Sequence, residues 1–351
     1  MVMSVLDKDF QTLFDSTLEY EKFKDANFLI TGATGLVGSL LIKSLLTLDD
    51  KFNLNLKIFA VVRNLQKAEN IFGELCRTKS LIFIKADLGS DNVVVKDDID
   101  YIIHAAAITT SKILVEKPVE AMDIAINGTK KVLELAKKKQ VKKMVYVSSM
   151  EIYGQINSVG KTSEPELGYV DLSKVRSGYP ESKRMCELMC NAYASEYNVN
   201  VVSARLAQTF GAGILPGENR VFAQFARSAM NNNDIVLHTE GKSEGNYVYT
   251  IDAVLALFVL LLRGEKGEAY NVSNPENHVT IREMAEVVAT NFSENSKVVI
   301  DVPSDSKKYG YAPDTHLWLD NSKLVKLGWT PQNNLVESYK KMIVWMKEEN
   351  I

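Results

Sequence analysis

Three glycines spaced three residues apart constrain the fold of this chain more than any other feature of its sequence. Gly32, Gly35 and Gly38 follow an apolar run at residues 27–31 and open a helical apolar pattern. Gly32 and Gly35 allow a tight turn and a close approach of the backbone to an anion, and Gly38 allows the helix to lie near the strand. The unpaired N–H groups at the start of that helix attract negative charge. A strand, a glycine turn and a helix in this order predict a dinucleotide-binding unit.

After the glycine turn, the chain alternates strand-like and helix-like segments. Strands are expected at residues 57–62, 81–85, 100–104 and 144–147, and helices at residues 65–77 and 113–139. Apolar strands separated by helices are typical of a parallel sheet covered on both faces. The predicted fold class is therefore α/β, with a Rossmann-type doubly wound parallel sheet and a smaller C-terminal substrate lobe.

The domain organisation follows from changes in this rhythm. Residues 1–25 contain apolar positions at helical spacing and are interpreted as an amphipathic leader helix, and residues 26–205 as the dinucleotide-binding domain. Five of the eight prolines lie beyond that point, so residues 206–351 are interpreted mainly as the substrate-binding lobe. The segment at residues 250–263 is apolar nearly all round, which predicts that it is buried and returns to the first domain.

Composition excludes several classes of partner. The 41 Lys and Arg against 44 Asp and Glu leave a net charge of −3, so neither nucleic acid nor a membrane surface is an expected partner. No apolar run is long enough to span a bilayer and the first residues lack a signal-peptide pattern, so a cytoplasmic location is expected. Cys76, Cys186 and Cys190 complete neither a disulfide framework nor a metal site, and no metal is expected.

A second motif combines a strand end with the start of a later helix. Residues 147–154 read Val-Ser-Ser-Met-Glu-Ile-Tyr-Gly, and residues 178–183 read Gly-Tyr-Pro-Glu-Ser-Lys. Tyr179 and Lys183 are one helical turn apart, so both side chains can face one cleft. A nearby ammonium and a positive nicotinamide ring are expected to lower the pKa of the tyrosine, and a serine hydroxyl can hold the same substrate oxygen. The expected chemistry is proton transfer coupled to hydride transfer.

In this order and at these distances the motifs resemble the extended short-chain dehydrogenase/reductase superfamily, in particular its NAD(P)-dependent nucleotide-sugar epimerase/dehydratase group. The resemblance covers nearly everything from Asn27 to Trp345. It implies that Tyr179 is the general acid or base on the sugar 4-hydroxyl, that Ser149 assists it, and that Lys183 holds the nicotinamide ribose. It also implies a transient 4-keto sugar and a cofactor that is recycled in place.

The candidate site residues fall into three groups. Catalytic roles are expected for Ser149, Tyr179, Lys183 and Glu151. Cofactor contacts are expected from Gly32, Thr34, Gly35, Leu36, Gly38, Arg63, Asp87, Leu88, Ala105, Ala106 and Ala107, together with Tyr179 and Lys183. Substrate contacts are expected from Thr109, Gln208, Arg220 and His238. A solvated arginine and a structural histidine are the alternatives for the last two residues.

Arg63 bears on the choice of cofactor. It follows the second predicted strand, where an acidic residue would bind the ribose in an NAD site. A guanidinium at that position can pair with a 2′-phosphate, which slightly favours NADP over NAD. The alternative is a solvated arginine at a strand end.

Departures from the family pattern bear on the reaction. Met150 stands where dehydratases carry an acid, Glu151 matches the dehydratase and decarboxylase glutamate, and Gly245 replaces an arginine that usually binds the diphosphate. An epimerase that acts through C4 oxidation is the leading prediction. The alternatives are a 4,6-dehydratase or uronic acid decarboxylase, an NADPH-dependent sugar reductase, and a non-enzymatic module that senses NAD(P). The two long helices resemble those of a four-helix interface in this family, so the expected partners are a nucleotide sugar and a second copy of the chain.

Overall fold

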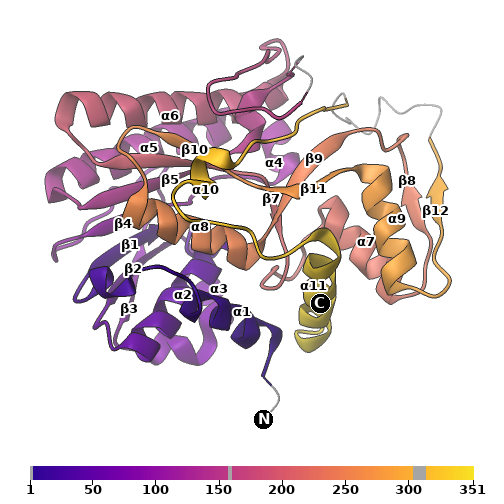
Figure 1. Ribbon diagram of the computed structural model, residues 1–351. Coiled ribbons are helices and arrows are strands. Elements are labelled where there is room, and N and C mark those ends of the chain that lie inside the picture. The colour runs from indigo at the N-terminus through magenta and orange to yellow at the C-terminus, as the bar shows by residue number, and fades with distance from the viewer. Residues whose placement is uncertain (1–2, 157–159, 303–313) are drawn as a thin grey trace.

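The computed structural model describes residues 3–156, 160–302 and 314–351. Its centre is a seven-stranded sheet in the order β10-β6-β5-β4-β1-β2-β3, in which all neighbours are parallel (Figure 1). The strands are β1 (Asn27–Thr31), β2 (Lys57–Val62), β3 (Leu81–Lys85), β4 (Tyr101–His104), β5 (Lys143–Ser149), β6 (Val201–Leu206) and β10 (Ala269–Val272). The predicted α/β class and its doubly wound parallel sheet are confirmed.

Helices cover both faces of this sheet, because its strands are apolar on both sides. One face carries α5 (Pro118–Lys139) and α6 (Gly178–Tyr197), which pack side by side, and the other carries α2 (Leu36–Phe52) and α8 (Thr250–Arg263) (Figure 1). Helix α8 is buried along nearly its whole length against β5 and β6. Strand β10, which follows α8, then joins the edge of the sheet beside β6, so the return of the chain to the sheet extends to Val272.

Two predicted helices differ from the structure. The long helix expected at residues 113–139 is divided into α4 (Ser111–Glu116) and α5, because Pro118 has no backbone N–H and holds Lys117 outside the helical region at φ −134°. The helix expected at residues 65–77 ends early as α3 (Leu65–Phe72), since Gly73 takes a positive φ of 50° and starts the 3-10 helix η2 (Gly73–Arg77).

The remaining elements form a smaller lobe beside the carboxyl ends of the central strands (Figure 1). A three-stranded sheet contains β7 (Gln208–Phe210), β9 (Glu244–Tyr249) and β11 (Asn274–Thr280), and β8 (Ile235–Leu237) pairs with β12 (Val298–Ile300). The helices of the lobe are α7 (Val221–Met230), α9 (Ile281–Phe292) and α11 (Leu335–Glu348), whereas α10 (Ser322–Val325) packs beside β10 at the edge of the central sheet. Helix α7 packs on α9 and α11. Strand β7 follows β6 directly in the chain, so β6 of the central sheet leads straight into the lobe.

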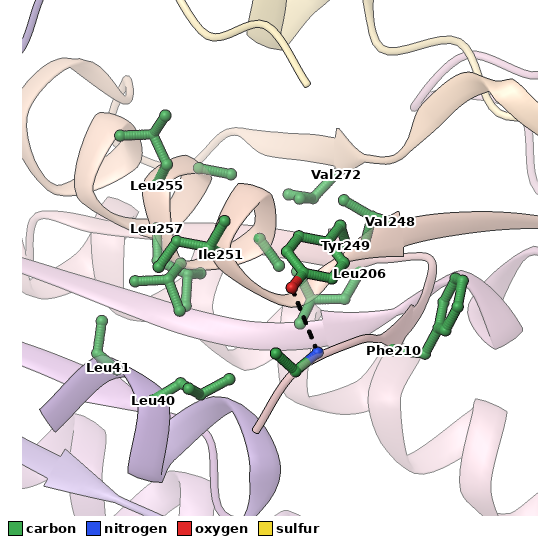
Figure 2. Packing of buried hydrophobic residues seen from close by; sticks show 14 of the residues in the cluster. Leu40, Leu41, Leu206, Phe210, Val248, Tyr249, Ile251, Leu255, Leu257 and Val272 are labelled. Atoms are coloured by element: carbon green, nitrogen blue, oxygen red, sulfur yellow. Dashed lines mark hydrogen bonds between the residues drawn. The ribbon is translucent and has the colours of Figure 1, made fainter. Parts of the chain in front are cut away.

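The leader segment forms α1 (Val5–Phe14), followed by the 3-10 helix η1 (Tyr20–Phe23). The buried carboxylate of Asp9 accepts a hydrogen bond from Tyr249 Oη at 2.5 Å and pairs with Lys341 Nζ at 2.8 Å. Figure 2 shows Tyr249 within the apolar core that α2, α8 and the central sheet share, where its hydroxyl also accepts a 3.4 Å hydrogen bond from the backbone N–H of Ala212. Helix α1 is thereby joined to α11 and to the link between sheet and lobe.

The described residues include neither a helix that could span a membrane nor a cluster that could hold a metal ion. None of their helices combines the length and the apolar character that crossing a bilayer requires. No three His, Cys, Asp or Glu side chains within residues 3–156, 160–302 and 314–351 are arranged to hold a metal ion. The three cysteines are free thiols.

Candidate active site

The site begins where β1 and β4 end. These strands are neighbours, but the chain continues from β1 to β2 on the opposite side, so the strand order reverses at this point and leaves a crevice. Gly32 lies in the turn with a φ of +69°, and a Cβ atom on it would lie 2.7 Å from the carbonyl carbon of Ala105. A Cβ atom on Gly38 would lie 2.2 Å from the carbonyl oxygen of Gly32. Only glycine fits either position, and the first residues of α2 line the cavity at this crevice.

A chain of buried hydrogen bonds supports the other wall of the crevice. Thr129 Oγ1 donates to the Ala125 carbonyl at 2.7 Å, so it accepts from His104 Nε2 at 3.0 Å, and His104 Nδ1 accepts from Thr31 Oγ1 at 2.6 Å. Thr31 Oγ1 in turn accepts from the backbone N–H of Ala106 at 3.2 Å. Burial lowers the pKa of His104 to about 3, with a smaller contribution from the Lys183 charge. His104 is therefore neutral, and it fixes the loop at residues 105–107, a role that sequence reasoning did not assign.

One cavity of about 440 Å³ joins the glycine turn, the end of β5, the start of α6 and the base of the lobe. It is lined by most of the residues singled out from the sequence, which are Gly32, Gly35, Leu36, Gly38, Ala105, Ala107, Thr109, Ser149, Glu151, Tyr179, Lys183, Gln208 and Arg220. Five segments far apart in the chain thus meet at one opening. Met150 also lines the cavity, at the position where the dehydratase pattern has an acid.

Six of the predicted residues do not line this cavity. Thr34 and Ala106 are partly buried beside lining residues, and Arg63 is exposed directly after β2. Asp87 and Leu88 follow β3, where Asp87 Oδ1 accepts from the Gly89 N–H at 2.9 Å and Leu88 is buried. These two residues and Arg63 still lie at the carboxyl edge of strands that pair with each other next to β1.

His238 is the predicted residue that the structure places away from the opening. It follows β8 in the lobe, and its Nδ1 lies 3.2 Å from the carbonyl oxygen of Asp301. The structure does not bring it to the cavity with the other candidates.

Lys183 is buried at the base of the cavity. Its Nζ donates to the carbonyl oxygen of Val147 at 2.7 Å and lies 6.0 Å from the centre of the Tyr179 ring and 4.8 Å from that of Tyr146. Burial lowers the pKa of Lys183 to about 8, against smaller opposing effects of Cys186 and Glu187. Its ammonium form is therefore held by a backbone carbonyl and two aromatic faces.

The pKa of Tyr179 differs from the expectation that it would be lowered. Burial, and next the negative charge of Glu151, raise it to about 12, although a hydrogen bond with Ser149 and the charges of Arg176 and Arg220 act in the opposite direction. The expectation relied on the Lys183 ammonium, which is directed to the Val147 carbonyl, and on the positive nicotinamide ring of a bound cofactor. In the protein alone Tyr179 is thus a neutral phenol at pH 7, able to donate a proton.

Glu151 is paired with an arginine that sequence reasoning missed. Arg176 Nη2 lies 2.9 Å and 2.8 Å from the two carboxylate oxygens of Glu151, and the guanidinium carbon lies 5.4 Å from the centre of the Tyr179 ring. Both charged residues line the cavity. The available signal was the spacing: Arg176 is three residues before Tyr179, which places the two on one side of a helical start.

Arg220 lies just before the first residue of α7 and reaches the cavity from the lobe. Its Nε and Nη2 bond the two carboxylate oxygens of Glu218 at 3.0 and 2.6 Å. No side chain caps the first turn of α7, and Val221 and Phe222 of that turn line the same cavity. The lobe therefore presents an arginine and a helix N-terminus together, a combination that favours an anion.

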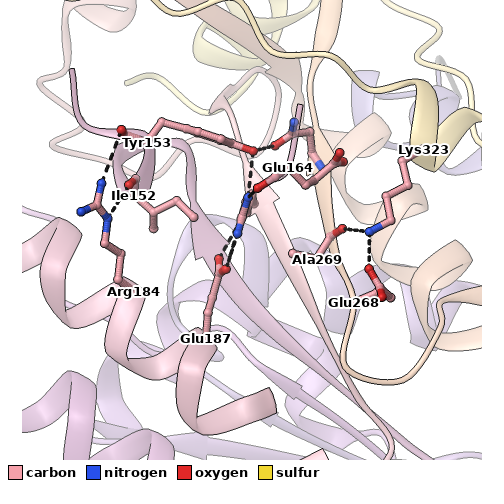
Figure 3. A network of polar contacts seen from close by, with 10 residues as sticks. Ile152, Tyr153, Glu164, Arg184, Glu187, Glu268, Ala269 and Lys323 are labelled. Carbon is pink, nitrogen blue, oxygen red and sulfur yellow. Dashed lines mark hydrogen bonds and ion pairs between the residues drawn. The ribbon is translucent and has the colours of Figure 1, made fainter. Parts of the chain in front are cut away.

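A buried polar network supports the 3-10 helix η3 (Met150–Tyr153), which carries Glu151. Arg205 Nη2 pairs with Glu187 at 2.8 Å, Arg205 Nη1 donates to Tyr153 Oη at 3.0 Å, and Tyr153 Oη donates to Asn271 Oδ1 at 2.6 Å (Figure 3). Burial, and then the Arg205 charge in opposition, set the pKa of Tyr153 at about 12. Elements α6, β6, η3 and β10 are thus linked beneath the site.

Comparison with known proteins places this geometry in context. The sequence profile of the NAD dependent epimerase/dehydratase family matches residues 28–273. The human dTDP-D-glucose 4,6-dehydratase is 26% identical over 338 residues, which are 91% of this chain and 89% of that protein. A trifunctional UDP-glucose 4,6-dehydratase/UDP-4-keto-6-deoxy-D-glucose 3,5-epimerase/UDP-4-keto-L-rhamnose-reductase of Arabidopsis thaliana is 26% identical over 93% of this chain, which spans only 48% of the plant protein.

Solved structures agree on the fold. An epimerase from Methanothermobacter thermautotrophicus superposes with a TM-score of 0.80 at 24% identity, covering 97% of this chain and 96% of that one. The sequence resemblance to the extended short-chain dehydrogenase/reductase group is confirmed, since the profile match extends over more than half of the residues. This chain therefore belongs to the NAD dependent epimerase/dehydratase family.

Proposed function

We propose that this chain is an enzyme that oxidises C4 of a nucleotide-activated sugar transiently and returns the hydride to complete an epimerisation. One observation carries the proposal: Ser149, Tyr179 and Lys183 line the same cavity as the glycine turn that opens α2. A site that only bound a dinucleotide would not need a buried ammonium and a buried phenol beside it, because burying such groups is costly.

The residues present fit a dinucleotide. The positions of Gly32 and Gly38 leave no room for a Cβ atom, and the N-cap residue Gly35 supplies no side-chain cap to the amides of α2. The turn and helix start would hold the diphosphate, and Ala105 and Ala107 would line its other side. The bound dinucleotide supplies the oxidant that takes a hydride from a carbinol carbon and later returns it.

Side chains of this protein transfer the proton of the sugar 4-hydroxyl. Tyr179 Oη gives or takes the proton of the sugar 4-hydroxyl, and Ser149 Oγ holds the same oxygen. Lys183 is fixed by the Val147 carbonyl, and its ammonium would hold the ribose of a bound nicotinamide. Arg220 and the first turn of α7 are the groups proposed for the diphosphate of the substrate, in place of the arginine that Gly245 replaces, with Gln208 and Thr109 on the cavity wall.

Other reactions remain as ranked alternatives on the same site. Glu151 supports a 4,6-dehydratase or a uronic acid decarboxylase, whereas Met150 opposes the dehydratase because a thioether cannot donate a proton to a departing hydroxyl. A reductase would use the same Ser149, Tyr179 and Lys183. The similar proteins named above include a dehydratase, a multifunctional enzyme and an epimerase, so their names alone do not select among these reactions.

The finer proposal for the cofactor is NADP, on the strength of Arg63. Its exposed guanidinium follows β2 beside the strand that leads to Asp87, where a 2′-phosphate on the adenosine ribose would lie. The family is described as NAD dependent, which argues against NADP. Titration of NAD and NADP into cofactor-free protein decides between them, and tighter binding of NAD would remove the argument from Arg63.

A homodimer is the proposed assembly, formed by α5 and α6. Their outer faces expose three apolar side chains, Val119, Met185 and Leu188, at 73%, 46% and 62%. A second copy using the same faces would bury these side chains around a two-fold axis. The cytoplasmic location expected from the sequence stays a prediction.

Two measurements test the proposed function. Mass spectrometry of the purified protein should detect retained NAD(P). Incubation with UDP- and dTDP-linked hexoses should then convert many sugar molecules per cofactor, with no net change at 340 nm. One cofactor consumed per turnover would instead indicate the reductase, and loss of a water or of carbon dioxide from the product would indicate a lyase. Retained cofactor without turnover of any nucleotide sugar would support the sensing module.

A further inference from the structure

Arg176 lines the cavity but has no part in the proposed reaction. It belongs to the 3-10 helix η4 (Val175–Ser177), which leads directly into α6. Its Nη2 lies 2.9 Å and 2.8 Å from the two carboxylate oxygens of Glu151, and its guanidinium carbon lies over the Tyr179 ring, 5.4 Å from the ring centre. One cation therefore contacts both a carboxylate and the face of the proposed acid or base.

Charged and hydrogen-bonding groups from several parts of the chain face Tyr179. They are Lys183 of α6, Tyr146 and Ser149 of β5, Glu151 of η3, Arg176 of η4 and Arg220 before α7. Among these six, Glu151 alone is an anion. The Lys183 ammonium is directed to the Val147 carbonyl and lies 6.0 Å from the ring centre, farther away than the Arg176 guanidinium. The charge that opposes a phenolate at Tyr179 is thus the one that Arg176 binds.

An unpaired carboxylate beside Tyr179 would hinder the reaction. To take the proton of the sugar 4-hydroxyl, the tyrosine must itself be a phenolate. Burial, and next the Glu151 charge, raise the pKa of Tyr179, whereas the Arg176 charge acts against them. A charge within about 4–6 Å shifts an ionisation by about 1–3 pH units, and partial exposure to water places the effect at the lower end. Pairing Glu151 with a cation that itself lies over the ring therefore removes an obstacle to the phenolate.

The pair of Arg176 and Glu151 contributes little to the stability of the fold. Both side chains are 34% exposed, and water screens an ion pair of this kind. The two contacts also share a single donor nitrogen, Nη2. The buried pair of Arg205 and Glu187, by contrast, uses both Nε and Nη2 and links β6 to α6. A contribution to the site therefore explains the position of Arg176 over Tyr179 better than a contribution to folding.

We propose that Arg176 is a positioning residue of the reaction, which holds the Glu151 carboxylate and cancels its charge, so that Tyr179 transfers its proton near neutral pH. The inference rests on the proposed function and deepens it, since Arg176 acts through Glu151 and Tyr179 and contacts no reacting atom. Each of the reactions ranked for this site uses the same tyrosine, so the role of Arg176 does not depend on which sugar is bound.

The pH dependence of kcat/KM tests this role on the nucleotide sugar that wild type converts. A base must lose its proton before it acts, so kcat/KM should rise with pH and level off above the ionisation of Tyr179. In Arg176→Met this rise should move upward by about one pH unit, which is about a tenfold loss on its acidic side and little loss on the plateau. Arg176→Lys keeps the charge and should keep the position of the rise. Arg176→Met/Glu151→Gln removes both charges and should return the rise towards that of wild type.

Lys174→Met is the matched control. Lys174 lies two residues before Arg176, is 57% exposed and pairs with Asp171 at 3.2 Å outside the cavity, so its replacement removes the same charge and should leave the rise in place. The melting temperature and the retained NAD(P) show whether Arg176→Met is folded. If it is not, Arg176→Gln, which removes the charge and keeps a hydrogen-bond donor, must show the same upward shift.

A second titration needs no substrate. The near-ultraviolet absorbance of phenolate is followed with pH in wild type and in Arg176→Met, each loaded with the oxidised form of the cofactor that it retains. The same titration of the matching Tyr179→Phe protein is subtracted from each, so that only the signal of Tyr179 remains. The phenolate should appear about one pH unit higher in Arg176→Met than in wild type.

The two readouts separate failure of this inference from failure of the proposed function. A rise or a phenolate titration that Arg176→Met leaves in place overturns the role of Arg176 while the proposed function stands. A loss of activity that is equal at every pH also overturns it, and so does the absence of a Tyr179 phenolate from folded wild type. A shifted phenolate titration in a protein that converts no nucleotide sugar supports the role of Arg176 and removes the proposed function.

Discussion

At the scale of single residues, Tyr179 and Lys183 have opposite departures from ordinary ionisation that share one cause. Burial favours the neutral form of each, raising the pKa of the phenol to about 12 and lowering that of the ammonium to about 8. A neutral tyrosine can donate a proton, whereas taking one as a base first requires its pKa to fall, which the positive charge of a bound oxidised nicotinamide would favour.

Replacement of Tyr179 by Phe removes the proton-transferring hydroxyl and keeps the ring. We expect kcat to fall by about 10²- to 10⁴-fold, the usual contribution of a general acid or base. The retained NAD(P), measured by mass spectrometry, should stay the same. Tyr169→Phe is the matched control, because Tyr169 is 63% exposed and lies outside the cavity. Equal activity of Tyr179→Phe and wild type would exclude the catalytic role.

Replacement of Lys183 by Met tests the cost of its buried charge. The pKa of Lys183 is lowered from 10.5 to about 8 on folding, so the unfolded chain binds an extra proton between these pH values. The free energy of unfolding of wild type should therefore rise with pH across this window, relative to Lys183→Met, by about 3 kcal/mol. Urea titrations of both proteins at pH 7.5, 9 and 10.5 measure this difference. Other titrating groups contribute equally to both proteins, so their contributions cancel in the difference. A constant difference would contradict the lowered pKa.

How far these residues were predictable depends on the range of the contact. The i, i+4 spacing of Tyr179 and Lys183 is local, and it indicated that both face one cleft, as they do in the structure. The contact between Lys183 and the Val147 carbonyl joins α6 to β5 and has no local signal. The raised pKa of Tyr179 in the protein alone comes from burial and from the Glu151 charge, neither of which has a local signal at Tyr179.

At the scale of elements, the strand, turn and helix around Gly32 depend on atoms that are missing from glycine. Gly38 lies inside α2, where alanine is intrinsically more favourable by about 0.5–1 kcal/mol. The carbonyl oxygen of Gly32 lies 2.2 Å from the position that its Cβ atom would take, and a backbone atom cannot yield easily. Close packing and helix propensity therefore predict opposite signs for one substitution.

We expect packing to prevail in Gly38→Ala. The free energy of unfolding should decrease by about 1–3 kcal/mol, the usual cost of overpacking, and the retained NAD(P) should decrease as well. Gly35→Ala is the control for stability alone, because Gly35 has a negative φ of −88° and its nearest atom would be 3.3 Å away, but it belongs to the same cofactor turn. Denaturant unfolding and cofactor content measured on both variants check this. A stabilised Gly38→Ala protein would show that the turn can open.

Elements were predictable where their signal was continuous. Strands β1, β2 and β3 were expected with the bounds that the structure shows, because each is an uninterrupted apolar run. Strand β10 has only four residues, Ala-Tyr-Asn-Val, and asparagine has a low preference for strands. The side chain of Asn271 accepts a hydrogen bond from Tyr153, so tertiary contacts override the weak local preference for a strand. The helix break at Pro118 had a local signal that the apolar periodicity obscured.

At the scale of the whole molecule, the network around Arg205 connects the central sheet to the segments that cover the site. Arg205 and Glu187 are both more than nine-tenths buried, and Arg205 also donates to the Glu164 carbonyl at 2.6 Å. A charge in such a place is tolerated only while its partner remains.

The network predicts a specific pattern of stabilities. Arg205→Met leaves Glu187 buried without its cation and should lower the free energy of unfolding by about 3–5 kcal/mol. The double variant Arg205→Met/Glu187→Leu should recover much of this loss, and Lys57→Met, which breaks an exposed pair with Asp97 at 2.9 Å, should show little change. Urea unfolding measures all three. Additive losses in the double variant would mean that the two charges do not act as a pair.

The assembly is tested on the outer face of α6. Light scattering should give wild type twice the chain mass of 39.2 kDa, whereas Leu188→Glu should shift the protein to 39.2 kDa because a charge would be buried between copies. Val94→Glu is the control, since Val94 is 75% exposed on the loop between β3 and β4. A wild-type mass of 39.2 kDa would overturn the proposed dimer.

The pairing of Asp9 with Lys341 has a consequence for the order of synthesis. The two residues are 332 positions apart, so a ribosome that adds about 5–20 residues per second completes α11 roughly 15 to 65 s after α1 has been made. During that interval the Asp9 carboxylate has no cation, and burying it would be unfavourable. Helix α1 is therefore expected to dock only after α11 has been made, although it is translated long before α11.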